Sequence, residues 1–180
     1  MRFFKSFAVT LTLIYTTLAL AQTEFKTVSQ SDFSPLIGKW SGTLTYLDYA
    51  DDSSRVQLEV RMDVTDSDSG FVTRTTFVEP NGEEIEDTGL LGPSHGGKRV
   101  MMDGRAWMLY DKKSTANGMT IVFQGPGQDD NKNAQLTHVL FMSTPGLLSQ
   151  DSVVLTKKVL YENAGLEIQR NQFRLGRVKE

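Results

Sequence analysis

The sequence predicts an all-β fold: an antiparallel up-and-down meander that closes into a barrel of about 8–10 strands. Apolar and polar residues alternate along most of the chain, which is the period of a half-buried strand. Short turn signals separate the alternating segments, and no segment has the period of a helix of two turns or more. Closure is expected because it removes edge strands that could pair with other chains. A two-sheet sandwich is the alternative, and it would need longer crossover connections.

The first 21 residues have the pattern of a signal peptide. Arg2 and Lys5 form a positive region, residues 7–18 are apolar and uncharged, and Ala19-Leu20-Ala21 fits the small-x-small cleavage rule. The apolar run is too short for a membrane span, although an N-terminal membrane anchor is the alternative interpretation. We therefore expect export to the bacterial periplasm or the extracellular space, with a mature chain that begins near Gln22.

The remainder of the chain is expected to be one domain, with a flexible polar arm over residues 22–32 and a single β-barrel over residues 33–180. The absence of cysteine excludes disulfides, thiol catalysis and zinc–thiolate sites. Acidic residues outnumber basic ones by 22 to 19 and no Lys/Arg run is present, so no nucleic-acid partner is expected. With two histidines and no cysteine, neither a metal site nor another cofactor is expected.

Strands are expected from Gly38 onwards. Residues 31–37 are turn-prone and are expected to form one turn of 3₁₀- or α-helix before the first strand. The clearest alternation runs over Val56–Val64, where every second residue is apolar and the residues between are Gln, Glu, Arg and Asp. The strands expected in chain order are 38–49, 56–64, 71–78, 85–91, 98–102, 105–110, 119–124, 134–143, 151–161 and 166–175.

Turn residues mark the connections between these strands. The tight turns fall at 66–70, 80–82, 103–104 and 163–165, where Gly, Asn, Asp and Pro gather. Residues 111–117 and 125–133 are polar and are expected to be loops, the second being the longest and most mobile connection.

The opening of the first strand carries a family resemblance. Phe33 followed by Gly38-x-Trp40 resembles the calycin superfamily, whose lipocalins open with G-x-W, and the stretch Gly38–Gly42 is similar to the G-x-W-x-G of nitrobindin-like barrels. The resemblance implies that Trp40 has a structural role and packs across one end of the barrel against an arginine of the last strand, Arg174 or Arg170. No histidine stands on the last expected strand, where nitrobindins place a haem ligand.

Three short motifs do not predict a catalytic or metal site. Gly92–Gly96 matches G-x-S-x-G, but the strand–turn–helix context of a nucleophile elbow is missing, so a glycine-rich turn is expected. Asp66-x-Asp68-x-Gly70 lacks the closing Glu of a calcium loop and is expected to be a solvated turn. Strand alternation divides the acidic run Glu83–Asp87 between two faces, which disfavours paired-carboxylate catalysis. No catalytic residue is therefore assigned.

The predicted function is the binding of a small hydrophobic molecule or lipid inside a lipocalin-like barrel, because about 8–10 strands enclose more space than side chains alone fill. His138 shares a face with Leu136 and Leu140. It is either a polar group that orients a ligand or a core histidine satisfied by a neighbouring group. The side chains expected to line the cavity are Leu44, Tyr46, Met62, Phe77, Met108, Tyr110, Phe123 and His138.

Three other classes stay open. An isomerase, cyclase or hydrolase on the same scaffold would use His138, Tyr46 or Tyr110 as acid or base. An outer-membrane barrel also has alternating strands, but residues 98–102 and 105–110 are too short to span, so no stable membrane insertion is expected. A structural or interaction barrel that uses its outer surface is the third class. The sequence does not indicate the oligomeric state.

Overall fold

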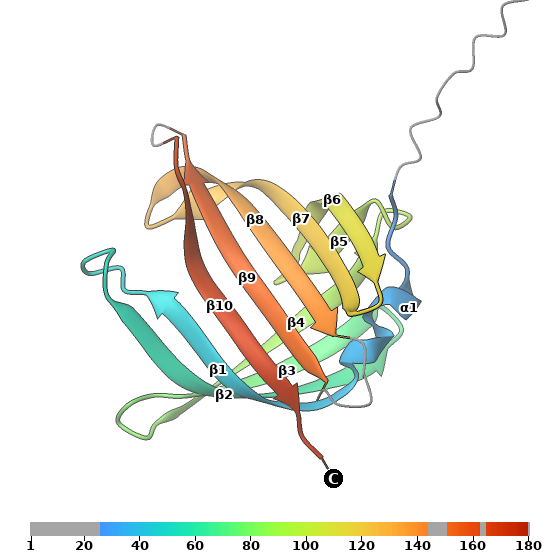
Figure 1. Cartoon of the computed structure of the whole chain (residues 1–180), viewed down its shortest axis with the longest axis horizontal. Coiled ribbons are helices and arrows are strands. Elements are labelled where there is room, and N and C mark those ends of the chain that lie inside the picture. The colour runs from blue at the N-terminus through green and yellow to red at the C-terminus, as the bar shows by residue number, and fades with distance from the viewer. Residues whose placement is uncertain (1–25, 144–150, 163–164, 180) are drawn as a thin grey trace, which may run out of the picture.

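The computed structural model describes residues 26–143, 151–162 and 165–179, over which the chain forms a closed antiparallel barrel of ten strands (Figure 1). Each strand pairs with the next in sequence, and β10 pairs with β1 to close the barrel. The elements are α1 (Gln30–Phe33), η1 (Ser34–Leu36), β1 (Gly38–Leu47), β2 (Arg55–Ser67), β3 (Gly70–Val78), β4 (Glu84–Ser94), β5 (Arg99–Met102), β6 (Arg105–Thr115), β7 (Gly118–Asp129), β8 (Lys132–Ser143), β9 (Ser152–Tyr161) and β10 (Glu167–Arg177). The predicted all-β meander barrel is confirmed. The predicted signal peptide, residues 1–21, lies outside the described residues.

Two segments predicted to be loops are strand instead. β6 continues to Thr115, and β7 and β8 extend until only the turn Asp130-Asn131 separates them. Both turn residues have positive φ, 50° and 57°, as a two-residue hairpin turn requires. Gly127 does not mark a turn; it leaves room for the Leu136 side chain, because a Cβ at this position would lie 2.6 Å from Leu136 Cδ1.

One end of the barrel is closed by the chain that precedes β1. α1 and η1 lie against this end in Figure 1, and Phe33 and Leu36 are buried there. Further upstream, Val28 is also buried, and its N–H donates to Gly97 O at 2.9 Å. The helical turn predicted before the first strand is present, and residues 26–32 of the predicted arm pack against the barrel.

Trp40 seals this end, with a cationic partner that differs from the predicted one. The indole is 2% exposed, its N–H donates to Leu36 O at 2.7 Å, and the Arg177 guanidinium lies 4.3 Å from the ring centroid. The predicted partner Arg174 is wrong because side chains alternate along β10. Leu175 faces inward and Arg177 follows on the same face, whereas Arg174 is exposed.

Arg170, the other predicted partner of Trp40, lies at the opposite end of the barrel. The pairing of β10 with β9 shifts between Gln169 and Asn171, so Arg170 is the extra residue of a β-bulge. The bulge turns its side chain inward, and the residue is 1% exposed.

A buried polar network surrounds Asp129 at this opposite end. The Asp129 carboxylate is fully buried and accepts hydrogen bonds from Tyr49 (3.0 Å), Lys157 (2.9 Å), Tyr161 (2.7 Å) and Arg170 Nε (2.7 Å). Burial and the hydrogen bond to Asp129 raise the pKa of Tyr49 to about 12. The network ties the β1–β2 connection to β7, β9 and β10 around one carboxylate.

Candidate functional site

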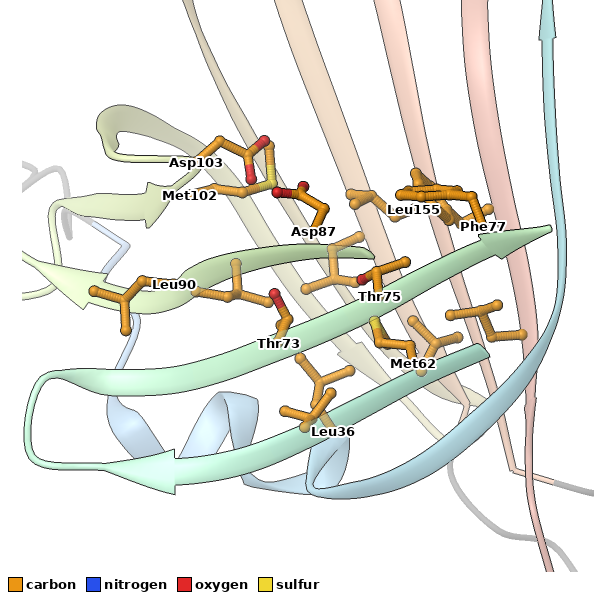
Figure 2. A pocket seen from close by; sticks show the side chains of 16 residues that line it. Leu36, Met62, Thr73, Thr75, Phe77, Asp87, Leu90, Met102, Asp103 and Leu155 are labelled. Carbon is orange, nitrogen blue, oxygen red and sulfur yellow. The ribbon is translucent and has the colours of Figure 1, made fainter. Parts of the chain in front are cut away.

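A mostly apolar cavity of about 160 Å³ lies inside the barrel, mainly between β2, β3, β4, β9 and β10 (Figure 2). Leu36 of η1 bounds it on the side of the closed end, and its walls include Met62, Phe77, Leu155 and Phe173. The polar side chains in its lining are Thr73, Thr75, Asp87 and Asp103. A few convergent polar groups in an apolar pocket are the usual composition of a small-molecule site.

The pairing of β3 with β4 brings the polar side chains of these strands together. Thr75 lies opposite Asp87, and Thr73 lies opposite Gly89, with all four positions on the inner face. Gly89 makes room for its neighbours. A Cβ there would lie 3.0 Å from Thr73 Oγ1 and 3.4 Å from Asp103 Oδ1. The absence of a side chain at Gly89 therefore lets the Asp103 carboxylate fold over β4 toward the cavity.

A gap in the barrel wall opens the cavity to the outside. β5 pairs with β4 only over Leu91–Ser94, so among the described residues no strand lies beside residues 84–90 on that edge. A hollow of about 580 Å³ covers this edge and shares Asp87, Leu90 and Asp103 with the cavity. We call this opening, between β4 and the β5–β6 turn, the portal.

The two portal carboxylates carry charge that no described side chain neutralises. Asp87 and Asp103 form no hydrogen bond or ion pair with any described residue, and the same holds for the hydroxyls of Thr73 and Thr75. Burial and the nearby charge of Asp87 raise the pKa of Asp103. Figure 2 shows the side chains of Asp87 and Asp103 toward one side of the cavity, near Met102.

Six of the eight predicted cavity-lining residues lie on the inner face of the barrel, but only two of them line this cavity. Met62 and Phe77 line the cavity. Leu44 and Tyr46 lie on the inner face of β1, opposite Phe173 and Asn171. Phe123 and His138 are buried on the inner faces of β7 and β8, away from the cavity lining.

Met108 and Tyr110 were assigned to the wrong face by the sequence pattern. They are 60% and 68% exposed on the outside of β6. Trp107 takes the inner face instead, where it is buried and its indole N–H donates to Met102 O at 3.2 Å. The pairing of β6 then shifts between Leu109 and Asp111, which makes Tyr110 a bulge residue.

His138 is packed between two aromatic side chains. Its ring stacks on Phe123 with centroids 5.2 Å apart and meets the edge of Trp107 at 4.5 Å. Its Nε2 is buried and has no hydrogen-bond partner among the described residues. Burial, with smaller contributions from the charges of Lys157 and Arg105, lowers its pKa to about 4. A neutral imidazole enclosed in this way does not reach the cavity.

The pKa of His138 predicts a loss of stability in acid. The folded-state pKa of about 4 lies below the ordinary value of 6.5, so the unfolded chain binds the proton more readily between these two values. Stability is therefore retained above that window and falls by about 3 kcal/mol as the pH drops through it. We expect His138→Gln to remove this part of the pH dependence in urea unfolding, and His95→Gln, at an exposed turn, to retain it. Equal acid sensitivity of the wild type and His138→Gln would contradict this assignment.

Sequence reasoning missed the two portal aspartates. Asp87 was grouped with a solvated acidic run, although alternation in β4 and the Asn81-Gly82 turn together place it opposite Thr75 on the inner face. No sequence signal places Asp103 beside it. That contact depends on where β5 pairs with β4 and on the missing side chain at Gly89.

Fold and site define a closed antiparallel β-barrel with an internal apolar cavity and an acidic portal. No family model matches the chain, and no curated protein matches it significantly. Within residues 26–143, 151–162 and 165–179, no helix is long and apolar enough to cross a membrane. In the same described residues, no three His, Asp or Glu side chains gather as a metal site would require.

Proposed function

We propose that this protein is an exported, lipocalin-like barrel that binds a small, mostly apolar molecule in its interior cavity. The observation that supports binding is the cavity itself, whose apolar walls meet four polar side chains without described partners. Export to the periplasm or the extracellular space is supported by the signal-peptide pattern of residues 1–21. A calycin relationship is supported by Gly38-x-Trp40 and by the arginine from the last strand that covers the indole.

The size of the cavity limits the enclosed part of the ligand. An engineered apolar cavity of about 150 Å³ holds benzene in another protein, and the cavity here measures about 160 Å³. The enclosed part is therefore about as large as one six-membered ring or a short branched chain. A longer molecule would extend through the portal into the outer hollow, where Thr88 and Gly104 would contact it.

An enzyme of the kind that uses His138, Tyr46 or Tyr110 is less well supported. Tyr110 is on the outer surface, and His138 is enclosed by Trp107 and Phe123. These candidate acid–base groups do not meet around one reacting atom, as general acid–base catalysis requires. Ligand binding needs only the cavity and its portal.

Binding can be tested by filling the cavity from one side. Thr75→Phe adds a ring on the inner face of β3, where Thr75 lines the cavity. Thr76→Phe adds the same ring on the outer face, beside Arg61 and Glu86. We expect toluene at about 100 times its dissociation constant to raise the unfolding free energy of the wild type and Thr76→Phe by about 2.7 kcal/mol. The Thr75→Phe protein should gain nothing.

The readouts are urea unfolding with and without toluene, and an NMR titration that locates the perturbed residues. Wild-type protein that is neither stabilised nor perturbed by toluene would reject the proposed function. Stabilisation of Thr75→Phe equal to that of the wild type would place the bound molecule outside this cavity and would also reject it.

A further inference from the structure

The buried or half-buried carboxylates Asp129, Asp32 and Asp151, at the two ends of the barrel, are neutralised by neighbouring cations. Asp129 contacts the cations Lys157 and Arg170 and two tyrosine hydroxyls, at the end of the barrel opposite α1 and η1, which we call the helical plug. At the closed end, Asp32 pairs with Lys112 at 2.7 Å and Asp151 pairs with Arg177 at 2.7 Å. Unpaired charge in a partly buried position is costly, which explains why these carboxylates have partners.

The two portal carboxylates are instead exposed at the rim of the cavity, where water can solvate their charge in the free protein. Asp87 and Asp103 lie close enough for the charge of one to raise the pKa of the other, and no described Lys or Arg is paired with either. Both line the cavity and the outer hollow at once. A molecule seated in the cavity therefore presents its outer end to two carboxylates that have no hydrogen-bond or ion-pair partner among the described residues.

The neighbouring hydroxyls complete a set of acceptors. Thr73 Oγ1 and Asp103 Oδ1 converge over Gly89, and Thr75 faces the cavity opposite Asp87. An ammonium group has three N–H donors and no acceptor, so its donors match two carboxylates and a hydroxyl in number, and its charge is opposite in sign to that of the carboxylates. The apolar walls around Phe77 and Leu155 would enclose the hydrocarbon part of the same molecule.

We propose that the ligand is a small hydrophobic amine, whose ammonium group binds between Asp87 and Asp103 while its apolar part fills the cavity. This inference rests on the proposed binding function and adds the class of ligand. It also predicts what the site rejects. A carboxylate or phosphate head group would meet two like charges at the portal, so fatty acids and other anions are disfavoured.

The test compares three ring compounds of nearly equal size: benzylamine, which is a cation at neutral pH, the neutral benzyl alcohol, and the anion benzoate. Dissociation constants are measured by calorimetry or NMR titration on the full chain as it is purified. We expect benzylamine to bind at least about tenfold more tightly than benzyl alcohol at low salt, with benzoate weakest. Added salt should reduce the preference for the amine.

The double variant Asp87→Asn/Asp103→Asn removes both charges and keeps the side-chain shapes. It should bind benzyl alcohol as the wild type does and lose the preference for benzylamine. Asn is compatible with the positive φ of 53° at residue 103, and neither aspartate holds a described partner, so the fold should be unaffected. The matched control Glu86→Gln/Asp68→Asn removes two exposed charges elsewhere on the surface and should keep the preference.

The outcomes separate the two proposals. Equal binding of the amine and the alcohol by the wild type would overturn the amine inference and leave the binding function intact. An amine preference that survives in Asp87→Asn/Asp103→Asn, with cooperative unfolding retained, would overturn it as well. Failure of all three compounds and of toluene to bind would remove both proposals together.

Discussion

Asp129→Asn is expected to lower the unfolding free energy by about 3–5 kcal/mol, because it leaves buried cations without their carboxylate partner. The substitution keeps the shape of the side chain but removes the charge that compensates Lys157 and Arg170. Arg170 is 1% exposed, so its guanidinium would stay buried with one carboxylate fewer. Domains of this size are typically stable by about 5–15 kcal/mol, so the variant would lose a large share of its stability.

The neighbouring Asp130 provides the matched control. Asp130→Asn removes an ion pair in which the Asp130 side chain is 33% exposed and the Lys132 side chain is 60% exposed. Such surface pairs contribute about 0–1 kcal/mol to stability. Asn also tolerates the left-handed backbone at this turn position, where φ is 50°. Urea unfolding near neutral pH measures both variants. Similar losses in the two would mean that the Asp129 network contributes no more than a surface pair.

The pH dependence of the same network has a definite sign. Burial alone would raise the pKa of Asp129, but hydrogen bonds from Lys157 and Tyr161 hold it below the ordinary value of 3.8. The stabilisation is therefore complete above that ordinary value and is lost as the pH falls through the lowered folded-state pKa. This contribution should be missing from the acid-unfolding profile of Asp129→Asn.

Trp40→Ala is expected to cost about 3–5 kcal/mol, because it removes a buried aromatic side chain that closes one end of the barrel. The indole also donates to Leu36 O at 2.7 Å, which holds η1 against the strands. Losing both contacts should loosen the helical plug together with the end of the cavity that Leu36 bounds. Urea unfolding gives the magnitude, and hydrogen exchange over residues 30–37 should show faster opening of the plug.

Two arginines of β10, Arg177 and Arg174, test which cation stabilises Trp40. Arg177 covers the indole and also donates to Ile37 O and Pro35 O, both at 2.7 Å. Arg177→Ala should therefore destabilise the protein and show a coupling of about 1 kcal/mol with Trp40→Ala in a double-mutant cycle. Arg174→Ala, at an exposed position of the same strand, should leave the unfolding free energy nearly unchanged. Coupling of Trp40 to Arg174 and not to Arg177 would contradict the observed pairing.

The portal is the part of the site that depends least on local sequence. The acidic run Glu83–Asp87 has the composition of a solvent-exposed strand, and Asp103 stands in a sequence typical of a turn. Asp87 and Asp103 become one site because β5 is only four residues long, and because Gly89 has no side chain in the space that the Asp103 carboxylate occupies. Both conditions depend on contacts between strands, which no window of sequence contains.

Local sequence by itself determined the number of strands and their order, because alternation and turn residues act over a few neighbouring positions. The sealing role of Trp40 was implied by the resemblance of Gly38-x-Trp40 to the opening of calycin barrels. Tertiary structure alone decided which side chains face inward beyond the bulges at Tyr110 and Arg170. One extra residue in a strand reverses the face of the residues that follow, and the position of a bulge is set by the partner strand.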